Sequence, residues 1–262
     1  MMSRLEKIFQ AKKQPVLNVY FTAGYPTLES TMPVMDALAK NGVDIIELGM
    51  PYSDPLADGP VIQESSTKAI SNGMTIAALF SQIGECRNNP HLLHTGIVLM
   101  GYMNPILQYG FERFCADAAT AGVDGLILPD LPAFEFENAY GAIIKKYGLD
   151  FIFLVTPETT EERVRELDNL SSGFLYAVSA SATTGGNTDF EKVNAYLKKL
   201  AAYQLKNPVM VGFGIKDQQS FTMATQYTQG AIIGSAYIKM LSTATDIESA
   251  TSQFIGQIRP KL

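Results

Sequence analysis

Cysteine, histidine and positive charge are all scarce in this sequence of 262 residues. The two cysteines, Cys86 and Cys115, stand in no metal-binding or redox spacing, so we expect reduced thiols and a cytoplasmic protein. The two histidines, His91 and His94, lie together just before an apolar run. This places them at the amino end of an expected strand, away from the carboxyl end where a histidine-based metal site would lie. The net charge of −6 argues against non-specific nucleic-acid binding, which needs a basic surface.

Long apolar runs are missing as well. No stretch reaches the roughly 20 apolar residues of a membrane-spanning helix. The segment Met1–Gln10 has charges among its apolar residues, which predicts a short amphipathic helix and no signal peptide. Because 47% of the residues are hydrophobic and 18% charged, the chain can still build a large core. Without a linker or a shift in composition, we expect one domain over residues 1–262.

Short apolar runs recur along the chain, separated by segments long enough for helices. Most runs are continuous in hydrophobicity, which is typical of parallel strands covered on both faces. Eight such units predict an α/β fold, a closed (β/α)8 or TIM barrel, with the N-terminal helix as an extra element at its bottom. The runs are Val16–Phe21, Asp44–Gly49, Gly96–Gly101, Gly125–Leu128, Phe151–Val155, Phe174–Val178, Val209–Phe213 and Ala231–Ile233.

The segments between the runs carry helix signals. Three of the amphipathic stretches are followed by glycine, a common residue just past a helix end, and the residue before the next strand is then aspartate. This repetition supports one βα unit iterated around a ring. The clearest helices are expected at Thr31–Asn41, Glu112–Ala121, Glu135–Tyr147 and Glu161–Leu170.

Acidic residues at the carboxyl ends of the strands are candidates for chemistry, because that end holds the site in such barrels. In the second run, Ile45, Glu47 and Gly49 share one face by the two-residue period of a strand. Glu47 therefore points into the barrel near its mouth, where burial raises a carboxyl pKa toward the range of acid–base catalysis. The alternative is a structural glutamate paired with a cation or with backbone groups.

The loop Met50–Pro60 follows that strand and is long for a connection between a strand and a helix, which suggests a functional role. Asp54 precedes a proline and fits a turn or cap. Asp58 is less easily explained as a turn or cap residue, so it is a candidate for a second catalytic carboxylate. Asp130 ends the fourth strand and fits a helix or loop cap at least as well as a catalytic acid.

Glycines cluster after the last three strands, at Gly185 and Gly186, at Gly212 and Gly214, and at Gly234. Glycine lets backbone N–H groups approach an anion, and helix N-termini add a favourable dipole. These loops therefore predict a phosphate site, the alternative being tight turns only. Lys216 could reach the phosphate or remain a solvated loop residue.

Two further absences narrow the chemistry. No lysine lies inside a strand near its carboxyl end, which argues against a Schiff-base aldolase. No glycine-rich dinucleotide fingerprint follows the first strand. We expect a site of carboxylates, a phosphate cradle and apolar walls, with no cofactor.

Several segments together resemble the tryptophan synthase alpha chain family, and the resemblance runs through the whole chain in order. The most specific is Glu47–Pro60, with the sequence ELGMPYSDPLADGP. Gly101–Ile106, Pro129–Pro132 and Gly212–Ile215 add to it. The resemblance implies a lyase of tryptophan biosynthesis that cleaves indole-3-glycerol phosphate to indole and glyceraldehyde 3-phosphate.

The resemblance also implies residue roles. Glu47 matches the catalytic glutamate, which helps protonate indole C3 and removes a proton from the glycerol hydroxyl. Asp58 matches the aspartate that accepts the indole N–H, and Tyr176 a tyrosine near the glutamate, although a core aromatic is the alternative. The substrate's phosphate would contact Gly185, Phe213, Gly214, Gly234 and Ser235, and Thr184 and Gly212 would also bind the substrate. The indole pocket would be walled by Tyr20, Met100, Ile127 and Ile232.

Two departures from the family pattern stand out. Position 20 is tyrosine where phenylalanine is expected, which puts a hydroxyl near the indole wall. The residues 180–182 leave the alignment of the following loop open by one position.

The family implies a partner, the pyridoxal-phosphate-dependent beta chain, in an αββα heterotetramer. The loops Ser53–Pro60 and Ala182–Asp189 would close as lids and touch that partner, with Gly185 and Gly186 as hinges. Two other functions stay open at this point: a different phosphate-binding barrel isomerase or epimerase, and a barrel kept only as a regulatory subunit.

Overall fold

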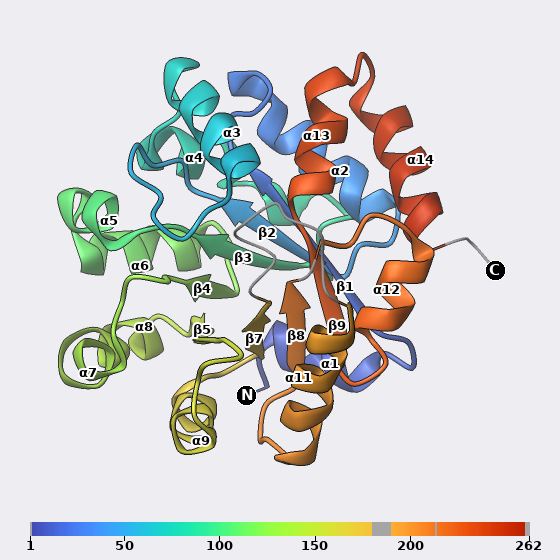
Figure 1. Ribbon diagram of the computed structural model, residues 1–262. Helices are drawn as coiled ribbons and strands as arrows, with labels where there is room; N and C mark the ends of the chain where they lie inside the picture. The colour runs from blue at the N-terminus through green and yellow to red at the C-terminus, as the bar shows by residue number, and fades with distance from the viewer. Residues whose placement is uncertain (1, 180–189, 213, 260–262) are drawn as a thin grey trace.

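The computed structural model describes residues 2–179, 190–212 and 214–259 (Figure 1). Its strands form one parallel sheet in the order β5-β4-β3-β2-β1-β9-β8-β7-β6. The strands are β1 (Val16–Thr22), β2 (Ile45–Gly49), β3 (Gly96–Met100), β4 (Gly125–Ile127), β5 (Asp150–Phe151), β6 (Leu154–Val155), β7 (Leu175–Val178), β8 (Val209–Gly212) and β9 (Gly230–Ile233).

The sheet closes on itself through the fifth predicted strand, which the structure divides into β5 and β6. The first half pairs with β4 and the second with β7. Between them the amide of Ile152 still donates to Leu126 O (3.0 Å), while Phe153 O accepts from the amide of Tyr176 (3.0 Å). One stretch of chain thus passes from one neighbour to the other, and the predicted (β/α)8 barrel is confirmed.

Helices surround the strands (Figure 1). Each apolar run predicted as a strand contains an observed strand, although several runs extend one residue beyond it and the fifth is interrupted at Ile152 and Phe153; Phe213 falls outside the described residues. The helices are α1 (Arg4–Ala11), α2 (Thr31–Lys40), α3 (Pro60–Ser71), α4 (Ile76–Ile83), α5 (Met103–Tyr109), α6 (Phe111–Thr120), α7 (Ala133–Glu135), α8 (Gly141–Lys146), α9 (Glu161–Leu170), α11 (Phe190–Ala202), α12 (Gln218–Ala224), α13 (Ser235–Thr243) and α14 (Ile247–Ile258). Among the residues described, no helix has the length and apolar character needed to cross a membrane.

The glycine signals at the helix ends are confirmed. Gly42, Gly122 and Gly148 have φ values of 78°, 81° and 69°, a region that residues with a Cβ rarely adopt. The aspartates that follow serve the barrel's amino end. Asp44 accepts from the amide of Leu17 (2.9 Å), and Asp124 accepts from that of Ile97 (2.8 Å).

The predicted helix Glu135–Tyr147 differs in one respect. Its middle, Phe136–Tyr140, is a π-helical turn between α7 and α8. The ring of Phe136 packs on Phe151 and Phe153, with centroids 4.7 and 5.2 Å away. A π turn shifts the side chains relative to a regular helix, and here it accompanies an aromatic cluster against the fifth strand.

Two apolar clusters lie on either side of the barrel wall. Ile46 and Leu48 of β2 belong to the outer cluster, between strands and helices. Ile45 belongs to the inner cluster, together with Leu5 from α1. Because Leu5 is fully buried among inward-facing strand residues, α1 closes the bottom of the barrel, as predicted. The mouth at the carboxyl ends of the strands is the end left for a site.

Candidate active site

Glu47 lies inside the barrel. It is on the same face of β2 as Ile45, which packs in the inner cluster, and it is only 1% exposed. Its Oε2 accepts a hydrogen bond from Asn18 Nδ2 on β1 (2.8 Å). Burial raises the pKa of Glu47 to about 8; the Asn18 hydrogen bond lowers it, and the charge of Asp58 raises it further. A carboxyl group with this pKa can both give and take a proton near neutral pH.

Asp58 lies in the loop between β2 and α3 and is half-buried. Its Oδ2 accepts a hydrogen bond from the Tyr102 hydroxyl (2.9 Å), and the same hydroxyl accepts from the amide of Ala57 (3.1 Å). Burial raises the pKa of Asp58 to about 6, against the lowering effect of the Tyr102 hydrogen bond. Asp58 is therefore ionised at neutral pH while Glu47 is mostly protonated.

Two tyrosines flank these carboxyl groups. Tyr20 is the register partner of Glu47 on the neighbouring strand, and Tyr176 comes from β7. Burial raises the pKa of both phenols well above the usual value, and the charges of Glu47 and Asp58 raise it further. Both hydroxyls therefore remain protonated and can donate hydrogen bonds.

Glycines in neighbouring strands make room for the two tyrosine rings. A Cβ at Gly49 would overlap the Tyr20 hydroxyl, and a Cβ at Gly212 would come within 2.5 Å of the Tyr176 hydroxyl. Glycine in a strand interior often marks such a close approach. Gly212 thus has a packing role at the site, in addition to the substrate contact predicted for it.

The expected apolar wall residues come together inside the barrel. Ile127 and Ile232 belong to the inner cluster, and Met100 and Tyr176 pack against it. Met100 is the register partner of Ile127 on β4. Three of the predicted wall residues and Tyr176 therefore share one interior, and the fourth wall residue, Tyr20, is the register partner of Glu47 on β1.

The predicted phosphate positions are described only in part. Gly234 and Ser235 form the start of α13, directly after β9, so their backbone amides lie at a helix N-terminus. Gly214 follows β8 and is exposed. Thr184, Gly185 and Phe213 lie outside the described residues, as does the whole predicted lid Ala182–Asp189 with its hinge glycines.

The remaining acidic candidates have structural contacts. Asp130 accepts the amide of Met103, the first residue of α5, at 2.9 and 3.1 Å, so its cap interpretation holds. Asp54 is exposed in its loop, and so is Lys216 after β8. His94 lies beside α1 at the amino end of the barrel, as expected from the sequence.

Sequence reasoning missed two residues of this site, Asn18 and Tyr102. Each binds one of the two carboxylates through its side chain. Asn18 had a detectable signal, since it is an amide within an apolar strand and has the same parity as Tyr20. Tyr102 had a weaker one, the position directly after β3.

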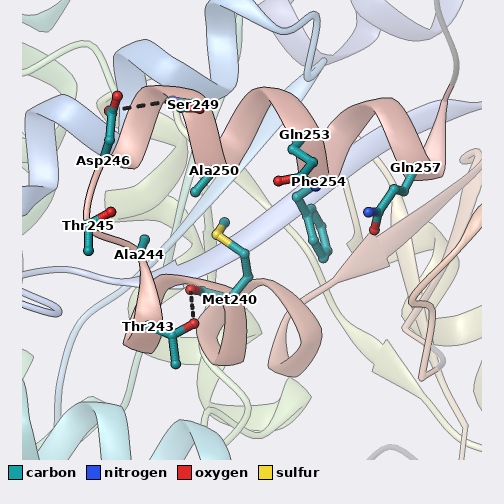
Figure 2. Close-up of a pocket in the computed structure, with 10 residues that line it drawn as sticks. All are labelled: Met240, Thr243, Ala244, Thr245, Asp246, Ser249, Ala250, Gln253, Phe254 and Gln257. Carbon is teal, nitrogen blue, oxygen red and sulfur yellow. Dashed lines mark hydrogen bonds between the residues drawn. The ribbon is translucent and has the colours of Figure 1, made fainter.

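Two other hollows lack this chemistry. Figure 2 shows one of about 400 Å³ between α13 and α14. Its carboxylate, Asp246, is used at the start of α14, where it accepts the amides of Glu248 (3.0 Å) and Ser249 (3.5 Å). The other, of about 790 Å³, lies beside α1 at the opposite end of the barrel from Glu47.

The closed (β/α)8 barrel, with two carboxyl groups of raised pKa at its mouth, places the protein among the barrel enzymes that carry acid–base groups at this end. Comparison with known proteins narrows this class. Residues 7–260 match the family described as tryptophan synthase alpha chain, and the protein belongs to that family.

Individual relatives agree with this assignment. The tryptophan synthase alpha chain of Flavobacterium johnsoniae is 47% identical over 259 residues, covering 98% of this chain and 100% of that one. The crystal structure of tryptophan synthase subunit alpha from Legionella pneumophila superposes with a TM-score of 0.89 at 33% identity, over 98% and 97% of the two chains. A tryptophan synthase structure from M. tuberculosis, in an aminoacrylate-bound form, gives 0.85 at 31% identity, over 98% and 100%.

Proposed function

We propose that this barrel cleaves indole-3-glycerol phosphate to indole and glyceraldehyde 3-phosphate, with Glu47 as the general acid and base. The observation that carries the proposal is the buried, inward-facing Glu47 with a pKa of about 8, beside an Asp58 that ionises at about 6. Family membership favours this lyase over another phosphate-binding isomerase or epimerase.

In the proposed reaction Glu47 transfers a proton twice, and Asp58 stabilises the positive charge that exists between the two transfers. Protonated Glu47 gives its proton to C3 of the indole ring, and the ring nitrogen becomes positively charged. The Asp58 carboxylate accepts the N–H hydrogen bond and stabilises that charge. Glu47, now a carboxylate, takes the proton of the hydroxyl next to the C3 bond. That bond then breaks, its electrons return to the ring, and Glu47 ends protonated as it began.

Binding would follow the barrel's geometry. The indole ring would lie against Tyr20, Met100, Ile127 and Ile232, with the Tyr176 hydroxyl as a further donor. The phosphate would sit on the amides that begin α13, at Gly234 and Ser235, where the helix dipole favours an anion. We propose Gly212 and Gly214 as further substrate contacts near the phosphate, together with Thr184, Gly185 and Phe213.

The proposed partner is the pyridoxal-phosphate-dependent beta chain, in an αββα assembly. Tryptophan synthase of M. tuberculosis is one of the structural relatives. Direct transfer to a partner suits indole, because it is small, neutral and apolar and would otherwise be lost. We also propose a cytoplasmic location, in keeping with two cysteines that are both buried and free.

Replacing each carboxyl group by its amide tests the function. Glu47→Gln should abolish indole release and leave substrate binding largely intact, because the amide keeps the shape but transfers no proton. Asp58→Asn should lower kcat on the order of 10²-fold or more. Indole formation from pure protein and indole-3-glycerol phosphate, with and without a beta chain, is the measurement.

Two results would contradict the proposal. Wild-type turnover in Glu47→Gln would refute the catalytic assignment of Glu47, whereas a wild-type protein that releases no indole with or without a beta chain would favour a purely regulatory barrel. An Asp58→Asn variant with raised KM and unchanged kcat would assign Asp58 to binding alone.

A further inference from the structure

An amide group lies in the barrel interior directly below the proposed site. Asn18 is fully buried on β1, and its register partners on either side are the aliphatic residues Ile45 and Ile232. Both of these belong to the inner apolar cluster, as does Val16, two residues before Asn18 on the same strand. From this apolar layer the Asn18 amide reaches up to Glu47, with Nδ2 donating to Oε2 at 2.8 Å.

The arrangement is costly for stability. Among the residues that the structure describes, none forms a hydrogen bond with the buried Asn18 Oδ1, and an unpaired polar atom in a protein interior destabilises the fold. An aliphatic side chain of similar size would match the neighbouring Ile45 and Ile232 without this cost. Packing alone therefore does not account for an amide at this position, whereas its contact with Glu47 does.

We propose that Asn18 is a positioning residue that fixes the Glu47 carboxyl group and stabilises the carboxylate formed each time Glu47 gives up its proton. This inference rests on the role proposed for Glu47. Asn18 touches no reacting atom itself, and it acts through the hydrogen bond to Oε2.

The groups around Glu47 explain why such a donor is useful. Asp58 from the β2–α3 loop is anionic and disfavours a second negative charge, and burial acts in the same direction. Tyr20 from β1 and Tyr176 from β7 are neutral phenols within electrostatic range of Glu47. Against these influences, the Asn18 hydrogen bond is the interaction that lowers the pKa of Glu47.

The amide can also serve the protonated form of Glu47. An asparagine side chain carries a donor and an acceptor of nearly the same shape. Half a turn of the Asn18 amide would present the unpaired Oδ1 to the O–H of protonated Glu47. One residue can thus hold the carboxyl group in the same place before and after proton transfer, which a lysine, with donors only, could not do.

Asn18→Leu tests this role. We expect kcat for indole release to fall about tenfold or more at neutral pH, the scale of a lost hydrogen bond to a charged group. KM should stay largely unchanged. The basic limb of the pH–rate profile should move upward from about 8, because the interaction that favours the Glu47 carboxylate is gone. The melting temperature should change little, because removal of the unpaired Oδ1 offsets the hydrogen bond lost at Glu47 Oε2.

Two controls isolate the effect. Tyr237→Phe removes another buried side-chain hydrogen bond, between Tyr237 and Thr251 (2.8 Å) on α13 and α14; it should lower the melting temperature and leave the pH limb in place. In a Glu47→Gln background, where no indole release remains to be lost, adding Asn18→Leu should leave the substrate affinity unchanged, because Asn18 contacts Glu47 and not the substrate. Asn18→Ala, with the same readouts, replaces the leucine variant if that one does not fold.

The outcomes separate the inference from the proposed function. If wild-type protein releases indole and Glu47→Gln does not, an Asn18→Leu variant with unchanged kcat and an unmoved basic limb overturns the role of Asn18 alone. Loss of kcat together with loss of stability, and with no movement of the limb, also overturns it and assigns a structural role. If Glu47→Gln remains active, the proposed function fails first, and the inference fails with it.

Discussion

Burial moves the pKa of Glu47 and of Asp58 upward by different amounts, which leaves the two carboxyl groups in different protonation states at neutral pH. In the reaction proposed above, Glu47 starts protonated, so activity should fall as the pH rises through about 8. The same proposal needs an ionised Asp58, so activity should fall as the pH drops through about 6. We therefore expect a bell-shaped profile of kcat/KM with limbs near these values. Because the groups interact, the limbs belong to the pair. A flat profile from pH 5 to pH 9 would contradict both assignments.

The Tyr102 hydroxyl should set the acid limb of that profile. Its hydrogen bond to Asp58 lowers the pKa of the carboxyl group, so Tyr102→Phe should move the acid limb to higher pH and reduce activity below neutrality. Tyr52→Phe is the matched control: Tyr52 packs on Tyr102 with ring centroids 5.4 Å apart, and its hydroxyl accepts from Asn104 instead. An acid limb that stays in place in Tyr102→Phe would show that the hydrogen bond does not control Asp58.

For single residues, the sequence predicts which side chains point into the barrel better than it predicts which side chains form hydrogen bonds with them. The orientation of Glu47 follows from the two-residue period of a strand, and its burial follows from the apolar residues around it. Asn18 and Tyr102 escaped notice because each meets its carboxylate across the fold, from 29 and 44 positions away in the chain. Such a contact depends on which strands become neighbours and on how they are staggered.

Helix α1 is the element that makes the barrel bottom a closed floor. Leu5 is fully buried, and a Cβ at Gly96 or at Gly173 would come within 2.9 Å of its methyl groups. Leu5→Ala should therefore leave a cavity and lower the free energy of unfolding by about 2–5 kcal/mol. The kcat of indole release should be unchanged at temperatures where the variant is folded, because the floor lies far from the mouth.

Leu93→Ala provides the comparison for this element. Leu93 lies near the same end of the barrel but is 46% exposed, so its loss should change stability by no more than about 0.5 kcal/mol. Denaturant unfolding of the two variants and the wild type measures the difference. Equal effects of Leu5→Ala and Leu93→Ala would mean that α1 only rests on the surface.

The helices and strands match the sequence prediction where nearby residues determine the structure. They differ from it where contacts with other parts of the fold determine the structure. Continuous apolar runs predicted the strands, and the glycines at 42, 122 and 148 predicted helix ends, since both depend on nearby residues. The division of the fifth strand into β5 and β6 comes from the change of pairing partner during barrel closure. The π turn at Phe136–Tyr140 accompanies the packing of Phe136 on two residues of that strand. Neither feature has a pattern of its own in the sequence.

At the scale of the whole molecule, the mouth of the barrel presents apolar side chains to solvent. Leu56 is 85% exposed, Phe134 70% and Leu107 47%, and they come from the segments that follow β2, β4 and β3. Hydrogen bonds join these segments: Asn104 donates to the Tyr52 hydroxyl (3.1 Å), and the amide of Met103 donates to Asp130. Exposed apolar groups on connected segments are typical of an interaction surface. Their position on segments that follow the carboxyl ends of the strands, where the proposed site lies, fits the beta chain as the partner.

A charge placed on this surface should separate association from catalysis. Phe134 lies on α7, away from Glu47 and Asp58 in the chain, so Phe134→Asp should leave indole release by the isolated protein unchanged. If its ring is buried by the beta chain, the carboxylate should weaken binding on the order of tenfold or more, because aromatic anchors carry much of the energy of an interface. Gln257→Asp, which adds the same charge to exposed α14 on the outer wall, is the matched control and should bind as the wild type does. Titration with a beta chain by calorimetry or sedimentation measures both variants. Equal affinities for Phe134→Asp and Gln257→Asp would place the partner on another face of the barrel.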